Sequence, residues 1–164
     1  MAEIWDILDE NGFITGRTMQ RSSILAAGDF HLVVHVWIID ESGQLLIQKR
    51  SDHCVWMPGK WAATGGAVIH GEDSVTAAAR ETEEEIGLAI KRNRFKFYAR
   101  LKGRNDLADI WYVKGVREEF LPLCLSSDVA DVKWVGIPVL RKMIVEGEFF
   151  SYGYLEDFLV QSVK

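Results

Sequence analysis

The chain has 164 residues, of which 48% are hydrophobic and 26% charged, with a net charge of −5. This length suits a single domain whose core needs no disulfide or structural metal, and the composition excludes a disordered or fibrous chain. The acidic balance argues against a nucleic-acid-binding protein. The two cysteines, Cys54 and Cys124, lack C-x-x-C spacing, which argues against a zinc site and a disulfide framework.

No apolar run approaches the roughly 18 residues that cross a bilayer, and residues 1–10 lack the basic-then-apolar order of a signal peptide. We therefore expect a cytoplasmic protein in a reducing compartment, with no membrane or nucleic-acid partner. A homodimer is the default assembly. Basic residues gather between Lys91 and Arg104, where a solvated strand edge is the simpler interpretation and phosphate contact is the alternative.

Turn signals and apolar patterning divide the chain into strands and helices. Asn11-Gly12 between two apolar runs predicts an N-terminal hairpin, and Asp40–Gly43 predicts the turn of a second one. Residues 17–29 and 51–60 look irregular. In chain order we predict strands at 4–8, 13–15, 30–39 and 44–49, an extended piece at 61–63, a helix from Asp73 to Ile86, strands near 95–101, 110–116 and 131–135, and helices from Pro138 to about Glu146 and from Tyr154 to Val160.

Strands with helices between and after them predict an α/β domain layered around one mixed sheet. We take residues 1–164 as a single domain with an N-terminal β-hairpin extension over about residues 1–28.

The helix predicted at 73–86 carries a concentration of negative charge. At about 100° per residue, Glu81, Glu84 and Glu85 fall on one face, beside the apolar stripe that packs on the sheet. Like charges at this spacing destabilise a helix, and the macrodipole disfavours them near the helix C-terminus. A hard divalent cation such as Mg²⁺ would compensate the arrangement. The stripe comprises Val75, Ala78, Ala79, Thr82 and Ile86.

Neighbouring residues fit the same interpretation. Arg80 is one turn from Glu84 and can fix the orientation of a carboxylate. Gly65 and Gly66 allow the backbone to approach a ligand closely, and a carbonyl there can add a metal ligand. A solvated acidic helix face would explain neither the glycine pair nor Glu72.

The spacing Gly-x5-Glu-x7-Arg-Glu-U-x-Glu-Glu-x-Gly-U, with U a bulky aliphatic residue, resembles the Nudix box. One position departs from it: Thr82 stands where an aliphatic residue is usual, and its methyl can pack while its hydroxyl bonds back to the helix. The strand pattern over roughly 29–145 also looks like the Nudix fold. The matching residues are Gly66, Glu72, Arg80, Glu81, Glu84, Glu85, Gly87 and Leu88.

The resemblance implies an α/β/α sandwich around a mixed β-sheet, with the box as a loop-helix-loop. It implies Mg²⁺ or Mn²⁺ as cofactor, and hydrolysis of a diphosphate linkage in a nucleoside diphosphate joined to another group. Glu72 belongs to an outer network that supports the site. The metal ligands would be Gly66, Glu81, Glu84 and Glu85; Glu81, Glu84 and Arg80 are the candidate catalytic residues; Trp56 and Arg50 are candidate substrate contacts.

A later acidic residue is an additional candidate for the general base, although an ordinary surface charge is the simpler interpretation of each. Among the other aromatic and histidine residues, core packing or a hydrogen-bonded histidine pair is favoured over substrate or metal contact. The acidic candidates are Asp106, Asp109, Glu118 and Glu119; the aromatic candidates for stacking are Trp56, Trp61 and Trp111; the histidines are His31 and His35, which face the same side of a strand, with His53 and His70 in loops.

Two other functions remain open. Residues 43–61 look like isopentenyl-diphosphate isomerase, a Nudix-fold relative, and His31 resembles one histidine of its metal site. The isomerase cysteine that follows this tryptophan has no counterpart in residues 62–66. A non-catalytic nucleotide-binding Nudix domain is the third possibility, but such domains commonly lose a box glutamate and this chain keeps all of them.

Overall fold

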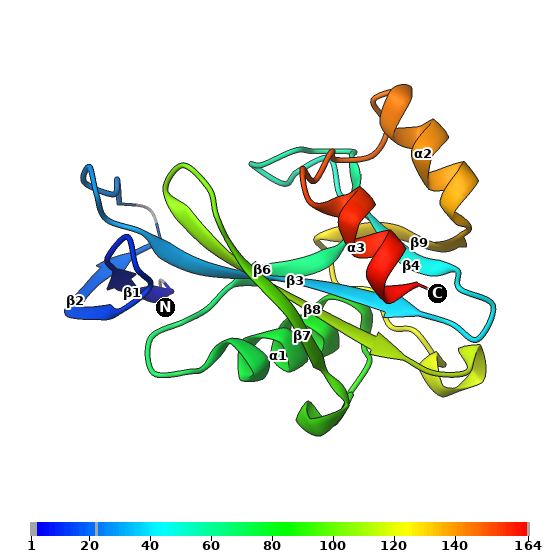
Figure 1. Ribbon diagram of the computed structural model, residues 1–164, viewed down its shortest axis with the longest axis horizontal. Helices are drawn as coiled ribbons and strands as arrows, with labels where there is room; N and C mark the ends of the chain where they lie inside the picture. Colours follow the sequence, from blue (N-terminus) through cyan, green and yellow to red (C-terminus); the bar gives the residue numbers. More distant parts are fainter. Residues whose placement is uncertain (1–2, 22, 164) are drawn as a thin grey trace.

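The computed structural model describes residues 3–21 and 23–163, and Figure 1 labels most of its elements. In chain order these are β1 (Ile4–Leu8), β2 (Ile14–Gln20), β3 (His31–Ile39), β4 (Leu45–Arg50), β5 (Trp61–Ala62), β6 (Thr64–Ala67), α1 (Ser74–Ile86), η1 (Arg92–Arg94), β7 (Lys96–Lys102), β8 (Asp106–Lys114), η2 (Arg117–Phe120), β9 (Val129–Val135), α2 (Ile137–Val145) and α3 (Leu155–Ser162). None of the helices in the described part of the chain is both long and apolar enough to span a bilayer.

A mixed seven-stranded sheet is built around β3. One edge of β3 pairs in parallel with β8 along its whole length. The other edge is shared: the first half of β3 pairs with β6, and only its last two residues pair with β4. Beyond this junction β4 also pairs with β5 and β9, and β7 lies outside β8. The division of one β3 edge between β6 and β4 places the strand before α1 beside the strand that ends at Arg50.

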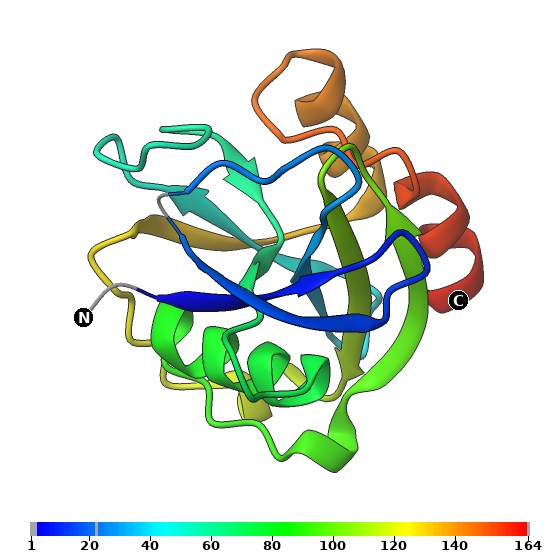
Figure 2. The same ribbon diagram turned by 90° about the vertical axis from the view of Figure 1, so that its left-hand side faces the viewer.

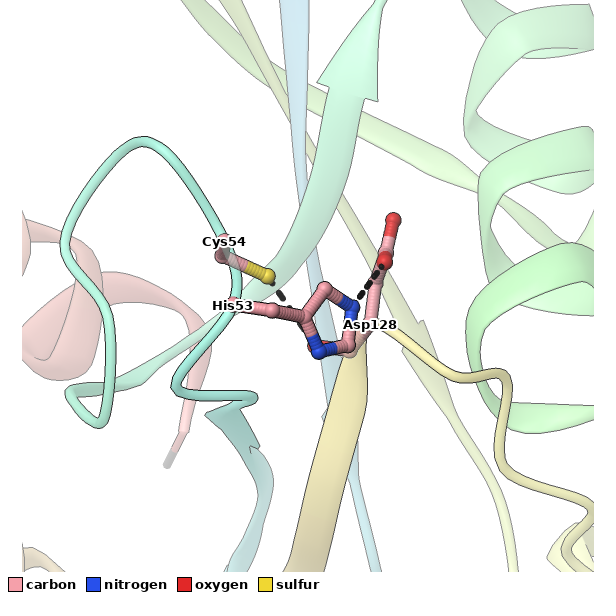
Figure 3. A group of neighbouring side chains, drawn as sticks. All are labelled: His53, Cys54 and Asp128. Carbon is pink, nitrogen blue, oxygen red and sulfur yellow. Dashed lines mark hydrogen bonds and ion pairs between the residues drawn. The ribbon is translucent and has the colours of Figure 1, made fainter.

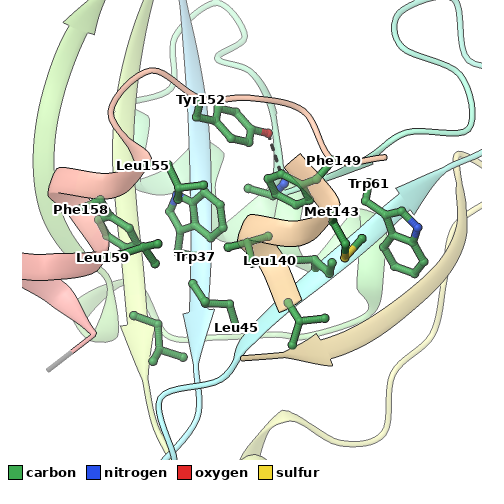
Figure 4. Packing of buried hydrophobic residues seen from close by; sticks show 14 of the residues in the cluster. Trp37, Leu45, Trp61, Leu140, Met143, Phe149, Tyr152, Leu155, Phe158 and Leu159 are labelled. Carbon is green, nitrogen blue, oxygen red and sulfur yellow. Dashed lines mark hydrogen bonds between the residues drawn. The ribbon is translucent and has the colours of Figure 1, made fainter. Parts of the chain in front are cut away.

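Helices cover both faces of the sheet, α1 on one side and α2 with α3 on the other (Figure 1). Val34, Val36 and Ile38 alternate along β3 toward α1, and Trp37 and Ile39 point to the opposite core. The second core is rich in aromatic rings, as Figure 4 shows around Trp37. This confirms the α/β/α sandwich expected from the sequence.

Local signals fix both ends of α1. The side chain of Asp73 accepts a hydrogen bond from the Thr76 N–H at 2.9 Å, which is an N-cap. Gly87 ends the helix in the left-handed conformation, with φ of 77°, and its N–H bonds back to the Glu83 carbonyl. Thr82 is fully buried and its hydroxyl donates to the Ala78 carbonyl at 2.7 Å, so the hydroxyl is satisfied within the helix as the sequence indicated.

The N-terminal hairpin of β1 and β2 packs against the loop that leads into α1, and it faces the viewer in Figure 2. The His70 N–H donates to the Ile4 carbonyl at 2.7 Å, and the His70 ring lies 2.8 Å from an Asp6 carboxylate oxygen. On the other side of β1, the Trp5 ring stacks on His31 with centroids 4.3 Å apart. The hairpin therefore contacts both the first residue of β3 and the box loop.

Three sequence-based boundaries were wrong, each because of a distant partner. β2 continues to Gln20 instead of ending at Thr15, since Gln20 pairs with Ile4 across the hairpin. β8 begins at Asp106, four residues before its predicted start, because it pairs with β3 from His31 onward. Residues 64–67 form strand β6 on β3, where the sequence suggested only a loop with two glycines.

Candidate active site

The acidic side chains of α1 divide into two positions. Glu81 and Glu85 are partly buried and point toward β6, whereas the Glu84 side chain is 60% exposed. Glu85 Oε2 accepts the Gly65 N–H at 3.1 Å and the Gln48 side-chain amide at 2.8 Å. The sequence placed all three glutamates on one face, and the structure turns two of them inward and one outward.

Arg80 ties these carboxylates to the loop before the helix. Its guanidinium donates to Glu72, to Glu81 at 2.8 Å and to Glu84 at 3.0 Å. It also donates to the Ala67 carbonyl at 2.9 Å. Burial opposes the charge of Arg80, but the hydrogen bonds and charges of Glu72 and Glu81 outweigh that cost and raise its pKa. One guanidinium thus orients three carboxylates, and Glu72 in turn accepts the Ile69 N–H at 2.9 Å.

The glycine pair is required by close packing on both sides of β6. A Cβ at Gly65 would lie 2.1 Å from the Val34 carbonyl oxygen of β3, inside any permitted contact. A Cβ at Gly66 would lie 2.4 Å from the Glu81 carboxylate. Gly65 therefore allows the strand to pair with β3, and Gly66 leaves space beside the carboxylate.

The two inward glutamates are held in surroundings that oppose their negative charge. Burial raises the pKa of the Glu85 carboxyl to about 7, and the charge of Glu81 adds to the effect. Donors on Gln48 and Gly65 and the charge of Arg50 reduce the shift without removing it. Burial also raises the pKa of Glu81, although Arg80 opposes this. The pair is a site where added positive charge would be stabilising.

Gln48 and Tyr152 belong to this site and were missed from the sequence. Gln48 lies in buried β4, where its amide donates to Glu85 and its oxygen accepts the Thr64 hydroxyl at 3.1 Å. The Tyr152 hydroxyl accepts the Ala63 N–H at 3.2 Å, a bond drawn in Figure 4. Burial raises the pKa of Tyr152, and the charge of Glu85 raises it further. A polar residue within the apolar run of β4 was the one available signal for Gln48.

Arg50 and Trp56 lie together, as their joint assignment to substrate contact requires. The Arg50 guanidinium is 5.2 Å from the centre of the Trp56 ring, and its Nε donates to the Trp56 carbonyl at 2.7 Å. Trp56 is 51% exposed and packs against Phe150 with centroids 5.0 Å apart. Because Arg50 also acts on the pKa of Glu85, this cation–aromatic pair borders the carboxylates.

Two of the additional acidic candidates for the base, Asp109 and Glu119, have partners of their own. Arg100 holds the buried Asp109 through two hydrogen bonds, at 2.6 and 2.8 Å, and Arg94 pairs with Glu119 at 2.9 Å. Asp106 lies against Gly103 and affects the pKa of His31. None of these contacts, among the residues described, joins Asp106, Asp109 or Glu119 to the glutamates of α1.

His31 and His35 are not bonded to each other, which corrects the expectation of a hydrogen-bonded pair. His31 stacks on Trp5, and its Nδ1 is buried without a hydrogen-bond partner. His35 Nδ1 lies 2.9 Å from the Tyr154 hydroxyl, and burial lowers the pKa of His35 to about 4. Both residues face the same side of β3, but the Trp5 ring of β1 stacks on His31 whereas the Tyr154 ring stacks on His35. Trp61 is buried in the core as expected, and Trp111 packs on Phe97.

Comparison with known proteins agrees with this geometry. A family model described as NUDIX domain matches residues 29–158. The chain belongs to the Nudix family. An uncharacterised Nudix hydrolase of Listeria monocytogenes is 40% identical over 159 residues, covering 94% of this chain and 92% of that protein. The isopentenyl-diphosphate Delta-isomerase of Streptomyces griseus is 38% identical over 85 residues, covering only 51% of this chain and 43% of the isomerase.

Solved structures agree on the Nudix fold. The protein DR0079 of Deinococcus radiodurans superposes with a TM-score of 0.77 at 20% identity, covering 99% of this chain and 100% of that one. A bifunctional NMN adenylyltransferase/ADP ribose pyrophosphatase of Francisella tularensis, complexed with AMP and a Mn ion, superposes with a TM-score of 0.62 at 18% identity, covering 82% of this chain and 42% of that one. At these identities the likeness establishes the fold alone.

Proposed function

We propose that this Nudix protein is a divalent-metal-dependent pyrophosphohydrolase, which cleaves the diphosphate linkage of a nucleoside diphosphate joined to another group. One observation carries the proposal: Glu81 and Glu85 are packed against β6 with raised pKa values, beside Glu84 and the anchoring Arg80. An anionic diphosphate could not approach this group unless a cation lay between them. The relationship to a Nudix hydrolase along nearly the whole chain supports the reaction class.

The donor set fits Mg²⁺ or Mn²⁺, since both prefer oxygen ligands. Glu81, Glu84, Glu85 and the Gly66 carbonyl are the proposed ligands, and a side chain at Gly66 would fill the space beside the Glu81 carboxylate. Bound there, the ion would offset the negative charge on the diphosphate oxygens while the linkage breaks. The Mn ion in the Francisella tularensis pyrophosphatase is compatible with this cofactor class.

The chain's own residues supply positioning and proton transfer. Arg80 keeps the carboxylates of Glu81 and Glu84 in fixed orientations through its hydrogen bonds. A carboxylate whose pKa is raised toward neutrality is suited to take a proton from the water that attacks phosphorus, as the anhydride P–O bond breaks and its electron pair leaves with the other phosphate. Glu81, whose pKa is raised by burial, is the proposed base where it does not itself hold the ion, with Glu84 and Glu85 then as the carboxylate ligands.

Arg50 and Trp56 are the proposed contacts for the rest of the substrate. The Arg50 guanidinium can donate to phosphate oxygens, and the half-exposed Trp56 ring offers a face to a planar group. Arg50 Nε also donates to the Trp56 backbone carbonyl, which holds the cation beside the segment that carries the ring.

The test is a panel of diphosphate compounds assayed with Mg²⁺ or Mn²⁺, using wild type, Glu84→Gln and Glu85→Gln. We expect metal-dependent turnover that falls by about 10²-fold or more in at least one variant. Glu83→Gln is the matched control, because Glu83 is exposed on the same helix at a position that the box leaves variable. Unchanged turnover in both test variants would contradict the proposal. Reaction in ¹⁸O-water identifies the phosphorus that is attacked, and an arm with isopentenyl diphosphate detects isomerase activity.

A further inference from the structure

One group of side chains outside the box also has the chemistry of a metal site. His53, Cys54 and Asp128 each place a ligand atom within 4.8 Å of the other two, and Figure 3 shows their arrangement. His53 Nε2 lies 3.0 Å from an Asp128 carboxylate oxygen, and Cys54 Sγ lies 3.5 Å from the Asp128 carbonyl oxygen. Among the residues that the structure describes, no other three His, Cys, Asp or Glu side chains place their ligand atoms within 4.8 Å of one another.

We propose that His53, Cys54 and Asp128 bind a zinc-class transition-metal ion, with a fourth coordination position open to solvent. An imidazole, a thiolate and a carboxylate are the ligand types that Zn²⁺ takes, at bond lengths of about 2.0–2.3 Å. Tetrahedral bonds of that length separate the donor atoms by about 3.3–3.8 Å. The present separations, none above 4.8 Å, therefore need only small side-chain rotations to reach that geometry.

The ligand set distinguishes this site from the acidic site on α1. On binding a metal ion, Cys54 would lose its thiol proton, so that its sulfur and the Asp128 carboxylate would supply two negative charges to one dication. A soft thiolate favours Zn²⁺ or Co²⁺ over Mg²⁺, which requires hard oxygen ligands in octahedral geometry. The site could not be predicted from the sequence, because the lack of C-x-x-C spacing bears only on sites built from cysteine pairs. The third ligand, Asp128, lies 74 residues from Cys54.

The backbone around the three ligands is already fixed. The Ser51 hydroxyl donates to the Ser127 carbonyl at 2.6 Å, and the Ser51 N–H donates to the Asp128 carbonyl at 2.9 Å. These bonds hold the start of the loop at residues 51–60 against the residues before β9. A metal ion at His53, Cys54 and Asp128 would extend this attachment toward the tip of the loop. It would act as a clamp on the segment that carries Trp56.

The test is titration of the full chain with Co²⁺, a spectroscopic substitute for Zn²⁺, in a non-thiol reductant. We expect about one equivalent to produce a thiolate-to-cobalt charge-transfer band that Zn²⁺ abolishes and excess Mg²⁺ does not. Carboxylate-bound cobalt at the box gives no thiolate band, so the result is independent of the proposed hydrolase activity. The band should disappear in Cys54→Ser and persist in Cys124→Ser, the matched control at an exposed cysteine outside the group.

His53→Ala and Asp128→Asn should each weaken cobalt affinity at least tenfold. Both side chains are more than half exposed, at 61% and 66%, so these variants are expected to fold. No band in wild type, a band that depends on Cys124, or unchanged affinity in both variants would overturn the site. Hydrogen exchange tests the clamp: Zn²⁺ should slow exchange in residues 52–57 of wild type but not of Cys54→Ser, and equal exchange with and without Zn²⁺ in wild type would overturn the clamp.

Discussion

Two carboxylates withdrawn from solvent, Asp40 and Glu85, are held in opposite ways by this protein. Asp40 follows β3 and accepts the backbone N–H groups of Ser42 and Gln44 while pairing with Arg117. Burial opposes its charge, but these donors outweigh the cost and lower the pKa of Asp40. Glu85 has fewer donors and a like-charged neighbour, so burial raises its pKa to about 7. The donors around Asp40 more than offset the cost of burying its charge, whereas the donors and the Arg50 charge near Glu85 do not.

The largest effect on stability should come from Asp40→Ala. Removal of the carboxylate leaves Arg117 and two turn N–H groups without their acceptor, so we expect the free energy of unfolding to fall by about 4 kcal/mol. Urea denaturation at pH 7 measures it, with the exposed Glu41→Ala as control, which loses a single hydrogen bond from the Arg117 N–H and should cost about 1 kcal/mol. Because the pKa of Asp40 is lowered in the fold, its stabilisation should be lost as pH falls through that pKa. Equal losses in the two variants would contradict the comparison.

Glu85→Gln should increase the free energy of unfolding, which Asp40→Ala should decrease. A carboxyl whose pKa is raised in the fold binds more protons when folded, so stability declines as pH rises from about 4.3 toward the folded pKa of about 7. The glutamine variant carries no such penalty, and without metal it should be up to about 3 kcal/mol more stable than wild type at pH 8. The gain should vanish near pH 4. Thermal or urea unfolding across this pH range is the measurement. A variant less stable than wild type at pH 8 would contradict the claim that burial disfavours the ionised Glu85 carboxylate.

The sequence predicted best what neighbouring residues determine. The bounds of α1 were correct to within one residue, because Asp73 and Gly87 cap the helix through contacts within four or five residues of themselves. The buried position of Thr82 followed from helical periodicity alone. The box was identifiable for the same reason, since its residues lie on one short segment of chain.

What the sequence could not supply came from distant pairings. β6 forms because residues 64–67 pair with β3, about thirty residues earlier in the chain. Nothing in Thr-Gly-Gly-Ala itself favours a strand. Gln48 reaches Glu85 across 37 residues, and His35 reaches Tyr154 across 119. The division of Glu81 and Glu85 from Glu84 also depended on which side of α1 faces β6.

A smaller effect should follow from Gln48→Met, which removes the side-chain amide that donates to Glu85 while keeping the length of the side chain. Since this donor lowers the pKa of Glu85, its loss should raise that pKa further. The pH-dependent loss of stability in the metal-free protein would then extend to higher pH than in wild type. Thr64→Val removes only the hydroxyl that donates to Gln48 and should shift the profile less. Identical profiles for wild type and Gln48→Met would show that Gln48 does not moderate the charge of Glu85.

The most direct measurement is an NMR titration of the Glu85 side-chain carboxyl in the full chain, with and without Mg²⁺. We expect a midpoint near pH 7 in the metal-free protein. Added Mg²⁺ should lower that midpoint clearly, because a bound cation favours the ionised carboxylate. An ordinary glutamate midpoint of about 4.3 that Mg²⁺ leaves unchanged would contradict both the raised pKa of Glu85 and its proposed role as a metal ligand.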